Sequence, residues 1–303
     1  MTFTKNRLYI GIAVAVAVLF LLWLIFRSSP VTVETAAAAR GPLLVTVDGE
    51  GKTRFRDKFT VNAPVSGKIS RIKMGEGDLI PKDYVITEVD PNPPSPRPPS
   101  EIENRLNPYA QKVYSPINGR VLRIFEKSER ILPAGTPLIE IGNPNTVEIV
   151  IDVLSTEAAQ IRAGSAALIS NEASAEPIKA RVRTVEPQAF TKVSALGVEE
   201  QRVNIIADFL TKGVHFGDNF RVDVRIIVWQ SENVLKIPSS ALFRSDEKWN
   251  VFVVEYGKAR RREVKIGHQN SSESEVLEGL TEGETVILHP PNQLADGAPV
   301  SSQ

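Results

Sequence analysis

Two hydrophobic patterns follow one another along this chain of 303 residues. The first is a run of nineteen uncharged, mostly apolar residues at 8–26. Beyond it, short segments rich in Val and Ile, such as 147–153, 221–226 and 251–255, are separated by Gly, Pro, Asn and Asp. Short strands spaced in this way are typical of β-sandwiches and β-barrels. The pattern predicts a mainly β protein that follows one helix of membrane-spanning length.

The apolar run has the length of a transmembrane helix. Nineteen helical residues rise about 28 Å, close to the ~30 Å of a bilayer's hydrocarbon core. Lys5 and Arg7 precede the run and Arg27 follows it, so the positive-inside rule predicts cytoplasmic residues 1–7 and export of everything after Pro30. A cleaved signal peptide is the alternative, but its apolar region is shorter and a small-residue site follows it directly. We expect a retained anchor.

One short soluble helix is expected after the segment at 147–153. Ser155 can cap its first turn, Glu157 suits the dipole there, and Gly164 can end it. Its apolar side would be formed by Ala158, Ala159 and Ile161.

The chain contains an internal repeat. Residues 61–90 align without gaps to residues 113–142 at an offset of 52. Pro fixes φ and Gly permits positive φ, so each copy is predicted to form two turns and two strands. Two such copies can close on each other as a small β-sandwich. The identical pairs are Val61/Val113, Pro64/Pro116, Gly67/Gly119, Arg71/Arg123, Ile72/Ile124, Pro81/Pro133 and Glu88/Glu140, and Leu79/Ile131 match in kind.

Composition and charge exclude several classes of function. Thirty-six Lys plus Arg balance thirty-six Asp plus Glu, so no net positive field favours nucleic acid. The absence of cysteine excludes disulfides, thiolate metal sites and cysteine nucleophiles. His215, His268 and His289 lack metal-ligand spacing. Because no Ser-centred elbow or HExxH motif is present either, we expect no catalytic residues, no metal and no cofactor.

Three consecutive arginines, at 260–262, follow Tyr256 and Gly257 in a predicted hairpin. They have two interpretations that the sequence leaves open. One is a solvated strand edge that deters self-pairing, and the other is contact with an anionic membrane face.

The repeat resembles the split biotinyl-lipoyl-like domain of the HlyD-type periplasmic adaptors, also called membrane fusion proteins. Residues 187–205 and 220–229 resemble that family's β-barrel domain, and residues 237–267 and 275–288 resemble its membrane-proximal domain. The resemblance implies that two of the domains are each built from two separate segments of the chain. Residues 31–59 would join 233–303 as the membrane-proximal β domain, 60–90 would join 113–143 as the lipoyl-like sandwich, and 144–232 would form the barrel with its short helix.

The resemblance implies a non-catalytic adaptor for efflux or secretion. Such an adaptor would be anchored in the bacterial inner membrane with its bulk in the periplasm. Its partners would be an inner-membrane transporter of the RND or ABC type, further copies of itself in a ring, and, indirectly, an outer-membrane channel. A membrane-anchored scaffold or regulatory binding protein that has lost the efflux role is the alternative.

Candidate contact residues lie in two places. A polar run in the barrel would contact the transporter or a neighbouring subunit, unless it is a loop held by local ion pairs. It comprises Phe190, Thr191, Lys192, Glu199, Glu200, Gln201 and Arg202. In the lipoyl-like repeat, the turn residues Pro64, Gly67, Pro116 and Gly119 are expected to have structural roles where copies of the domain pack together.

Residues 91–112 depart from the family, which has a long α-helical hairpin at this place. The segment holds seven prolines, and even two helical arms of ~9 residues would rise only about 14 Å. We expect a linker rather than a peptide that docks a partner, and no direct bridge to an outer-membrane channel. In lipoyl domains the modified lysine lies in the turn between the halves, whereas Lys73 precedes Glu76 inside the first half, so no lipoyl or biotinyl group is expected.

Overall fold

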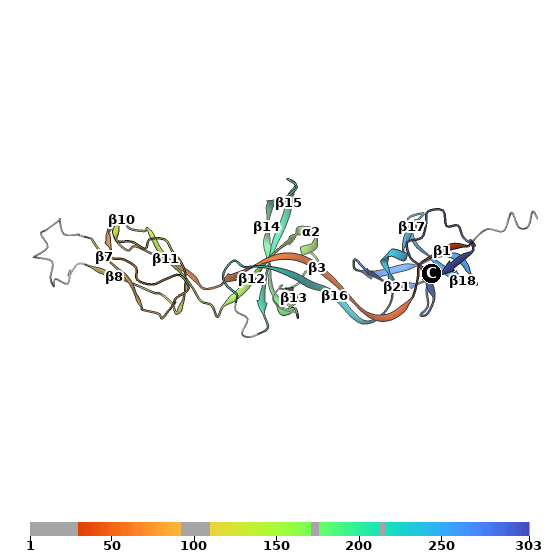
Figure 1. Cartoon of the computed structure of the whole chain (residues 1–303), viewed down its shortest axis with the longest axis horizontal. Helices are drawn as coiled ribbons and strands as arrows, with labels where there is room; N and C mark the ends of the chain where they lie inside the picture. The colour runs from red at the N-terminus through yellow and green to blue at the C-terminus, as the bar shows by residue number, and fades with distance from the viewer. Residues whose placement is uncertain (1–29, 92–109, 171–175, 212–215, 303) are drawn as a thin grey trace, which may run out of the picture. The chain divides into compact units, whose positions relative to one another are not determined.

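The computed structural model describes the chain at residues 30–91, 110–170, 176–211 and 216–302. Strands account for 61% of the structure and helix for 3%, so the mainly β prediction is confirmed. The chain divides into two compact units (Figure 1). Unit 2 is Thr46–Val228, and unit 1 combines the described residues up to Val45 with those from Trp229 onward.

The predicted span at 8–26 and the residues before it lie outside these ranges. Within the ranges themselves, every helix is too short or too polar to cross a bilayer.

Part of unit 2 is a sandwich of two four-stranded sheets built from the repeat. One sheet has the strand order β10-β5-β7-β8 and the other β4-β11-β9-β6. The first copy contributes β4 (Lys58–Asn62), β5 (Gly67–Ile69), β6 (Leu79–Ile80) and β7 (Val85–Asp90). The second contributes β8 (Gln111–Tyr114), β9 (Gly119–Ile124), β10 (Arg130–Leu132) and β11 (Pro137–Gly142). Every sheet therefore mixes strands of both copies, and each copy completes the other.

The two copies have matching backbone conformations at their second turns. Asp83 and Gly135, which are equivalent in the repeat, have φ angles of 63° and 84°. The core between the sheets includes the repeat-equivalent pair Ile86 and Leu138, both buried. The symmetry in the sequence is thus present in the fold.

Gly67 and Gly119 are required for a different reason from the one expected. Neither has a positive φ. Instead, a Cβ on Gly67 would lie 2.2 Å from the carbonyl oxygen of Asp90, and one on Gly119 would lie 2.8 Å from that of Gly142. Both glycines are buried inside the sandwich, so they permit close approach of strands within one domain.

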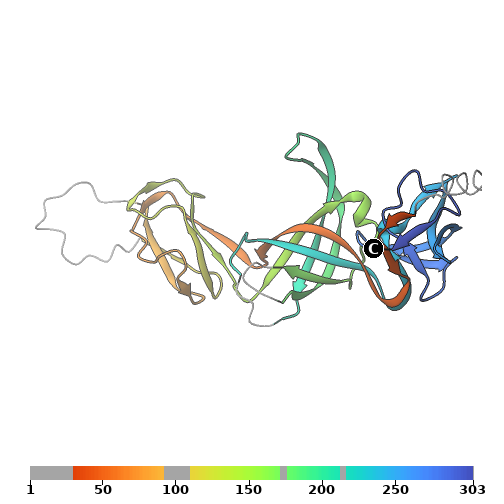
Figure 2. The same cartoon turned by 45° about the vertical axis from the view of Figure 1, so that its right-hand side comes forward.

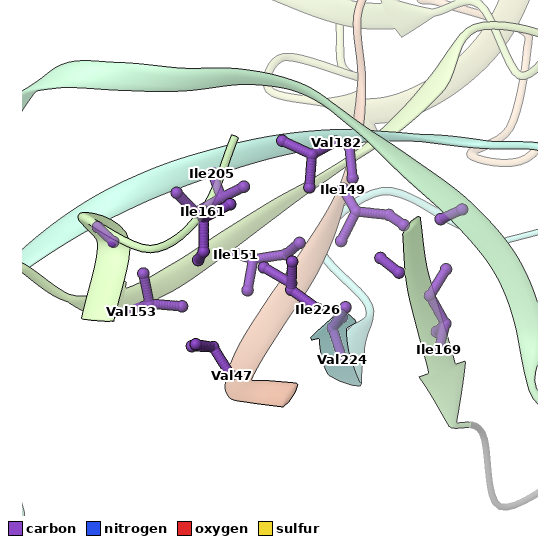
Figure 3. Packing of buried hydrophobic residues seen from close by; sticks show 14 of the residues in the cluster. Val47, Ile149, Ile151, Val153, Ile161, Ile169, Val182, Ile205, Val224 and Ile226 are labelled. Atoms are coloured by element: carbon purple, nitrogen blue, oxygen red, sulfur yellow. The ribbon is translucent and has the colours of Figure 1, made fainter. Parts of the chain in front are cut away.

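The remainder of unit 2 is a closed barrel. Its strands are β3 (Ala39–Phe55), β12 (Val147–Leu154), β13 (Ala166–Ser170), β14 (Ile178–Val193), β15 (Glu199–Phe209) and β16 (Arg221–Pro238). They follow the order β13-β14-β15-β12-β3-β16, and β13 also pairs with β16, which closes the circle. Alternate residues of β12, such as Ile149 and Ile151, point into the core with Ile205 from β15 and Ile226 from β16 (Figure 3).

The predicted boundary of the first domain at residue 59 needs correction. β3 is one strand of 17 residues, and Glu50–Phe55 pair with β12 in the barrel. Gly49 and Gly51 leave room for the barrel side chains of Ile151 and Ile149, which their Cβ atoms would otherwise overlap. Residues 46–55 therefore belong to the barrel rather than to the membrane-proximal domain.

The short helix α2 (Ser155–Ala158) lies at the end of β12, but its capping differs from the prediction. Leu154 occupies the N-cap and no side chain caps the helix. Ala158 and Ile161 pack into the barrel core, and Gly164 has a φ of 93° in the turn that leads to β13.

Unit 1 is formed by both ends of the described chain. Its main sheet has the order β17-β18-β22-β2, with β19 on β18. These strands are β2 (Thr35–Ala37), β17 (Phe243–Ser245), β18 (Lys248–Glu255), β19 (Lys258–Glu263) and β22 (Thr285–Ile287). A parallel pair, β1 (Val31–Val33) and β23 (Val300–Ser302), and the hairpin of β20 (Lys265–Gln269) and β21 (Glu273–Glu278) complete the unit, with a 3₁₀ turn at Ser239–Ala241.

Candidate functional site

The polar residues predicted to contact a partner lie together on the β14–β15 hairpin. This hairpin extends away from the other barrel strands in both views of the molecule (Figures 1 and 2). Phe190 pairs with Arg202, Thr191 with Gln201 and Lys192 with Glu200. The turn is closed by hydrogen bonds between Ser194 and Val198 and from Gly197 to Ser194, with Gly197 at a φ of 78°.

The charged residues of this hairpin form local ion pairs. Lys192 Nζ lies 2.6 Å from Asp152 Oδ2, and Arg202 Nη2 lies 2.9 Å from Asp152 Oδ1 on β12. Arg202 Nη1 also lies 2.7 Å from Glu200. These contacts agree with the alternative interpretation, a loop held by local ion pairs, for Lys192, Glu200 and Arg202. They orient the hairpin on β12.

The tip of the hairpin carries apolar side chains that the sequence analysis did not select. Leu196 is 92% exposed, and Val193 and Val198 beside it are also exposed. Exposed apolar groups gathered at a projecting tip are typical of interaction surfaces. We call Val193, Leu196 and Val198 the apolar tip. The sequence does contain a signal for the apolar tip, because its apolar residues lie in and beside a turn between two polar strands.

An open groove of about 750 Å³ is lined by residues 192–195 at the turn end of the hairpin and by residues of β3, β13 and β16. Charges of both signs line it, including Asp48, Glu50, Lys192, Glu200 and Arg225. Within the described part of the chain, no group of three or more His, Asp or Glu side chains is placed to hold a metal ion. The groove is therefore a polar surface hollow, open to solvent.

The lipoyl-like sandwich has a second exposed apolar feature, which the repeat duplicates. Leu79 on β6 is 66% exposed and its equivalent Ile131 on β10 is 68% exposed. β6 and β10 are each at one end of a sheet. Each sheet thus ends in a short strand that presents a large aliphatic side chain to solvent, which makes both edges accessible to a neighbouring molecule.

The remaining candidates of the sequence analysis are dispersed. Pro64 and Pro116 are exposed in the bends before β5 and β9. Lys73 is exposed and precedes the turn at Glu76–Gly77. His268 stacks on Trp229 with ring centroids 3.9 Å apart, and His215 lies outside the described residues. The structure therefore brings together the seven hairpin residues, but not the histidines or Lys73.

Residues 92–109 of the proline-rich segment lie outside the described ranges, but both of its flanks are placed. Val89 on β7 pairs with Gln111 on β8. The segment therefore leaves one strand of the sandwich and enters the strand beside it.

Comparison with known proteins finds a family that matches one part of the chain and relatives that align with most of it. Residues 234–302 match the family described as "YknX, C-terminal permuted SH3-like domain". The "Putative efflux system component YknX" of Bacillus subtilis (strain 168) is 29% identical over 202 residues, which are 63% of this chain and 52% of that protein. The match thus spans about half the length of that relative.

A second relative aligns along nearly its whole length. The "Macrolide export protein MacA" of Escherichia coli O157:H7 is 23% identical over 368 positions, covering 94% of this chain and 96% of that protein. Because the alignment has more positions than this chain has residues, MacA contains insertions relative to it. The crystal structure of MacA from Actinobacillus actinomycetemcomitans has the same fold, with a TM-score of 0.64 at 17% identity, covering 84% of this chain and 99% of that one.

Proposed function

We propose that this chain, a homologue of the efflux-system proteins YknX and MacA, is a non-catalytic adaptor that couples an inner-membrane transporter to export. The observation that carries the proposal is the similarity to MacA, which extends over 94% of the chain in sequence and reaches a TM-score of 0.64 in fold. Its expected place is the periplasm, anchored by the helix at 8–26, with residues 1–7 in the cytoplasm.

The proposed contact with the transporter is the β14–β15 hairpin. Its base is oriented on β12 by Asp152, Lys192 and Arg202, and the apolar tip faces solvent. On binding a partner, the apolar tip would become the buried core of the interface, and the polar residues around it would form the rim. Thr191 and Gln201, which hydrogen bond to each other at 2.7 Å, would belong to that rim.

The lipoyl-like sandwich is the proposed contact between copies of the chain, as the ring expected from the family requires. Leu79 and Ile131 lie on edge strands. We place the packing surface at these edges rather than at Gly67 and Gly119, because both glycines are buried within the domain.

The segment at 91–112 limits the reach of the proposed adaptor. It starts and ends on neighbouring strands, so at ~3.1 Å per residue for half its length it projects a few tens of ångströms. MacA has additional residues relative to this chain, which agrees with a shortened hairpin here. The adaptor would contact an outer-membrane channel only through another component. The same shortening favours the second candidate, a membrane-anchored scaffold without an efflux role.

A pull-down with a tag at Gln303, after zero-length cross-linking in the native host, tests the proposal. We expect a transporter of the RND or ABC type in the eluate, cross-linked to residues of the barrel or of unit 1. Recovery of no transporter would favour the scaffold. Direct cross-links between residues 91–112 and an outer-membrane channel would contradict the limited reach.

A further inference from the structure

The described chain begins beside the tip of the β18–β19 hairpin. Val31 pairs with Val300 in the parallel strands β1 and β23, and the Val31 amide donates to the carbonyl of Pro299 at 2.9 Å. The Val300 amide donates in turn to the carbonyl of Gly257 at 2.9 Å. Since neighbouring strands lie about 5 Å apart, the hairpin tip is within two strand spacings of the start of β1.

Tyr256 at this tip has an unusual position. Its side chain is fully exposed, at 103%, and its φ is 50°. Side chains other than glycine adopt positive φ at a cost, and no packing in unit 1 requires an aromatic ring at this point. The residue nevertheless presents a ring with a polar hydroxyl directly to the surroundings. Tyrosine has this combination at membrane interfaces, where its ring meets the acyl boundary and its hydroxyl meets water.

The arginines that follow Tyr256 differ in their contacts. Arg262 Nη1 lies 2.6 Å from Glu284, and its Nη2 binds Glu255. The hydrogen bond and charge of Glu284, together with Glu255, raise the pKa of Arg262 despite its partial burial. Arg262 is therefore part of the structure of the sheet. Arg260, by contrast, is half exposed and lies 3.7 Å from an equally exposed Asp296.

Lys258 adds a second exposed cation at the tip. It follows Gly257 directly and pairs across the hairpin with Glu255. Arg262 is shared by Glu255 and Glu284, and Arg260 is paired with Asp296. With the exposed Arg261, the four cations at 258–262 exceed these three carboxylates by one charge, so the hairpin next to Tyr256 has a positive character.

The chain length before β1 brings this tip close to a bilayer. From residue 26, the end of the apolar run, to Val31 the chain advances five residues, at most about 17 Å when fully extended. The headgroup layer adds about 5–7 Å on each side of the hydrocarbon core. A tip next to the start of β1 is therefore within reach of the headgroups if residues 8–26 span the membrane.

We propose that the hairpin tip formed by Tyr256, Lys258 and Arg260 is a membrane-contact site that binds anionic lipid headgroups. Tyr256 inserts its ring at the interface, and the two cations attract the phosphate groups. The contact gives unit 1 a second attachment to the bilayer besides the anchor, and so limits the motion of unit 1 relative to the membrane. The proposal rests on the membrane anchor of the proposed function.

Site-directed spin labelling of the full chain tests the proposal, because the chain has no cysteine. Single variants Tyr256→Cys and Leu277→Cys are labelled and reconstituted into vesicles that contain 30% phosphatidylglycerol in phosphatidylcholine. Leu277 is the control: it is 53% exposed on β21, a strand that pairs with β16 and β20 and not with β1, β23 or the β18–β19 hairpin. We expect the label at 256 to collide more with oxygen and less with a water-soluble nickel complex than the label at 277.

A charge-reversed chain tests the role of the cations. In Lys258→Glu/Arg260→Glu, we expect the label at 256 to lose at least half of this difference in phosphatidylglycerol vesicles. Equal accessibility of both labels in the unaltered chain overturns the proposal. Protection at 256 from both reagents indicates a protein contact and overturns it as well.

Failure of the anchor is recognised separately. A carbonate wash followed by flotation shows whether the chain stays with the vesicles. If the chain is released, the anchor in the proposed function fails and this inference fails with it. If the chain floats but its label at 256 behaves as the label at 277, only the hairpin contact is contradicted.

Discussion

Glu148 on β12 is a buried carboxylate held by Arg54 on β3, by Arg56 just after β3 and by Arg183 on β14. Its side chain is 3% exposed. Arg54 Nη2 lies 2.6 Å and Arg56 Nε 3.3 Å from its oxygens, and Arg183 on β14 binds the same group. Burial by itself would raise the pKa of Glu148, but the hydrogen bonds and charges of Arg54 and Arg183 outweigh it and lower the pKa below 4.5.

Replacement of this carboxylate should destabilise the barrel. We expect Glu148→Gln to lower the free energy of unfolding by about 2–3 kcal/mol at pH 7, because hydrogen bonds to a charged group are lost. Since the folded pKa is lowered, the stabilisation by Glu148 is present above about pH 4.5 and is lost as the pH falls through the folded pKa. Urea unfolding between pH 7 and 3 should therefore show a shallower pH dependence in the variant.

Asp208→Asn is the matched control for this prediction. Asp208 contacts Arg56 and Arg183 but is 38% exposed, so its loss should cost under about 1 kcal/mol. Equal effects of the two substitutions would contradict the special role of Glu148.

Gly67 and Gly75 allow a second comparison between single residues. A Cβ at Gly67 would overlap the backbone of Asp90, whereas one at Gly75 would find its nearest atom, on Asp78, at 3.6 Å. Because backbone atoms must move to admit the methyl group, Gly67→Ala should destabilise the sandwich by about 1–3 kcal/mol or more. Hydrogen exchange of β5 and β7 should accelerate in Gly67→Ala and stay unchanged in Gly75→Ala. Unchanged exchange in both variants would refute the close-approach explanation.

In the β14–β15 hairpin, the residues that hold the fold differ from those proposed to contact a partner. Ion pairs with Asp152 attach the base of the hairpin to β12. The apolar tip is largely exposed, as Leu196 shows. Changes at the tip should therefore affect partner binding without affecting the fold.

Serine substitution of the apolar tip tests this separation. The triple variant Val193→Ser/Leu196→Ser/Val198→Ser should change the free energy of unfolding by under about 0.5 kcal/mol. Recovery of the transporter with the tagged chain should fall at least tenfold, as quantitative mass spectrometry would measure. Leu277→Ser, a substitution at another exposed leucine, in unit 1, should leave recovery unchanged. Full recovery with the triple variant would move the contact to another surface.

The charges beside the apolar run predict the topology of the whole molecule. Lys5 and Arg7 precede residues 8–26, so the C-terminus is expected outside the cytoplasm. An alkaline phosphatase fusion at Gln303 should be active, and deletion of 8–26 should abolish that activity. The mature protein should begin at or next to Met1. An inactive fusion, or an N-terminus near Ala39, would overturn the retained anchor.

The lack of a carrier function is a second prediction for the whole molecule. Lys73 lies within the first half of the repeat, before the turn at Glu76–Gly77, and not in the turn between the halves. The intact mass of the protein from its native host should therefore contain no lipoyl or biotinyl group, while a lipoyl-domain protein from the same cells carries one. An added mass of either kind would contradict the adaptor function.

The sequence by itself determined the strand-rich class, the extent of the repeat and the equivalence of residues such as Leu79 and Ile131. These features depend on local propensity and on the repeat in the sequence, so they can be predicted without knowledge of distant contacts. The resemblance to the adaptors also rested on local strings of sequence, and the similarity to YknX and MacA supports it.

Only the tertiary structure decided how individual residues are used. Residues 50–55 joined the barrel because β12 pairs with them from about a hundred residues away. Gly67 is required by the carbonyl of Asp90 and not by its own φ. The charges of Lys192 and Arg202 are balanced by Asp152 and Glu200, while Leu196 is left exposed. Each outcome depends on which strands become neighbours, and hydrophobic burial over the whole barrel selects those neighbours rather than any pattern within one segment.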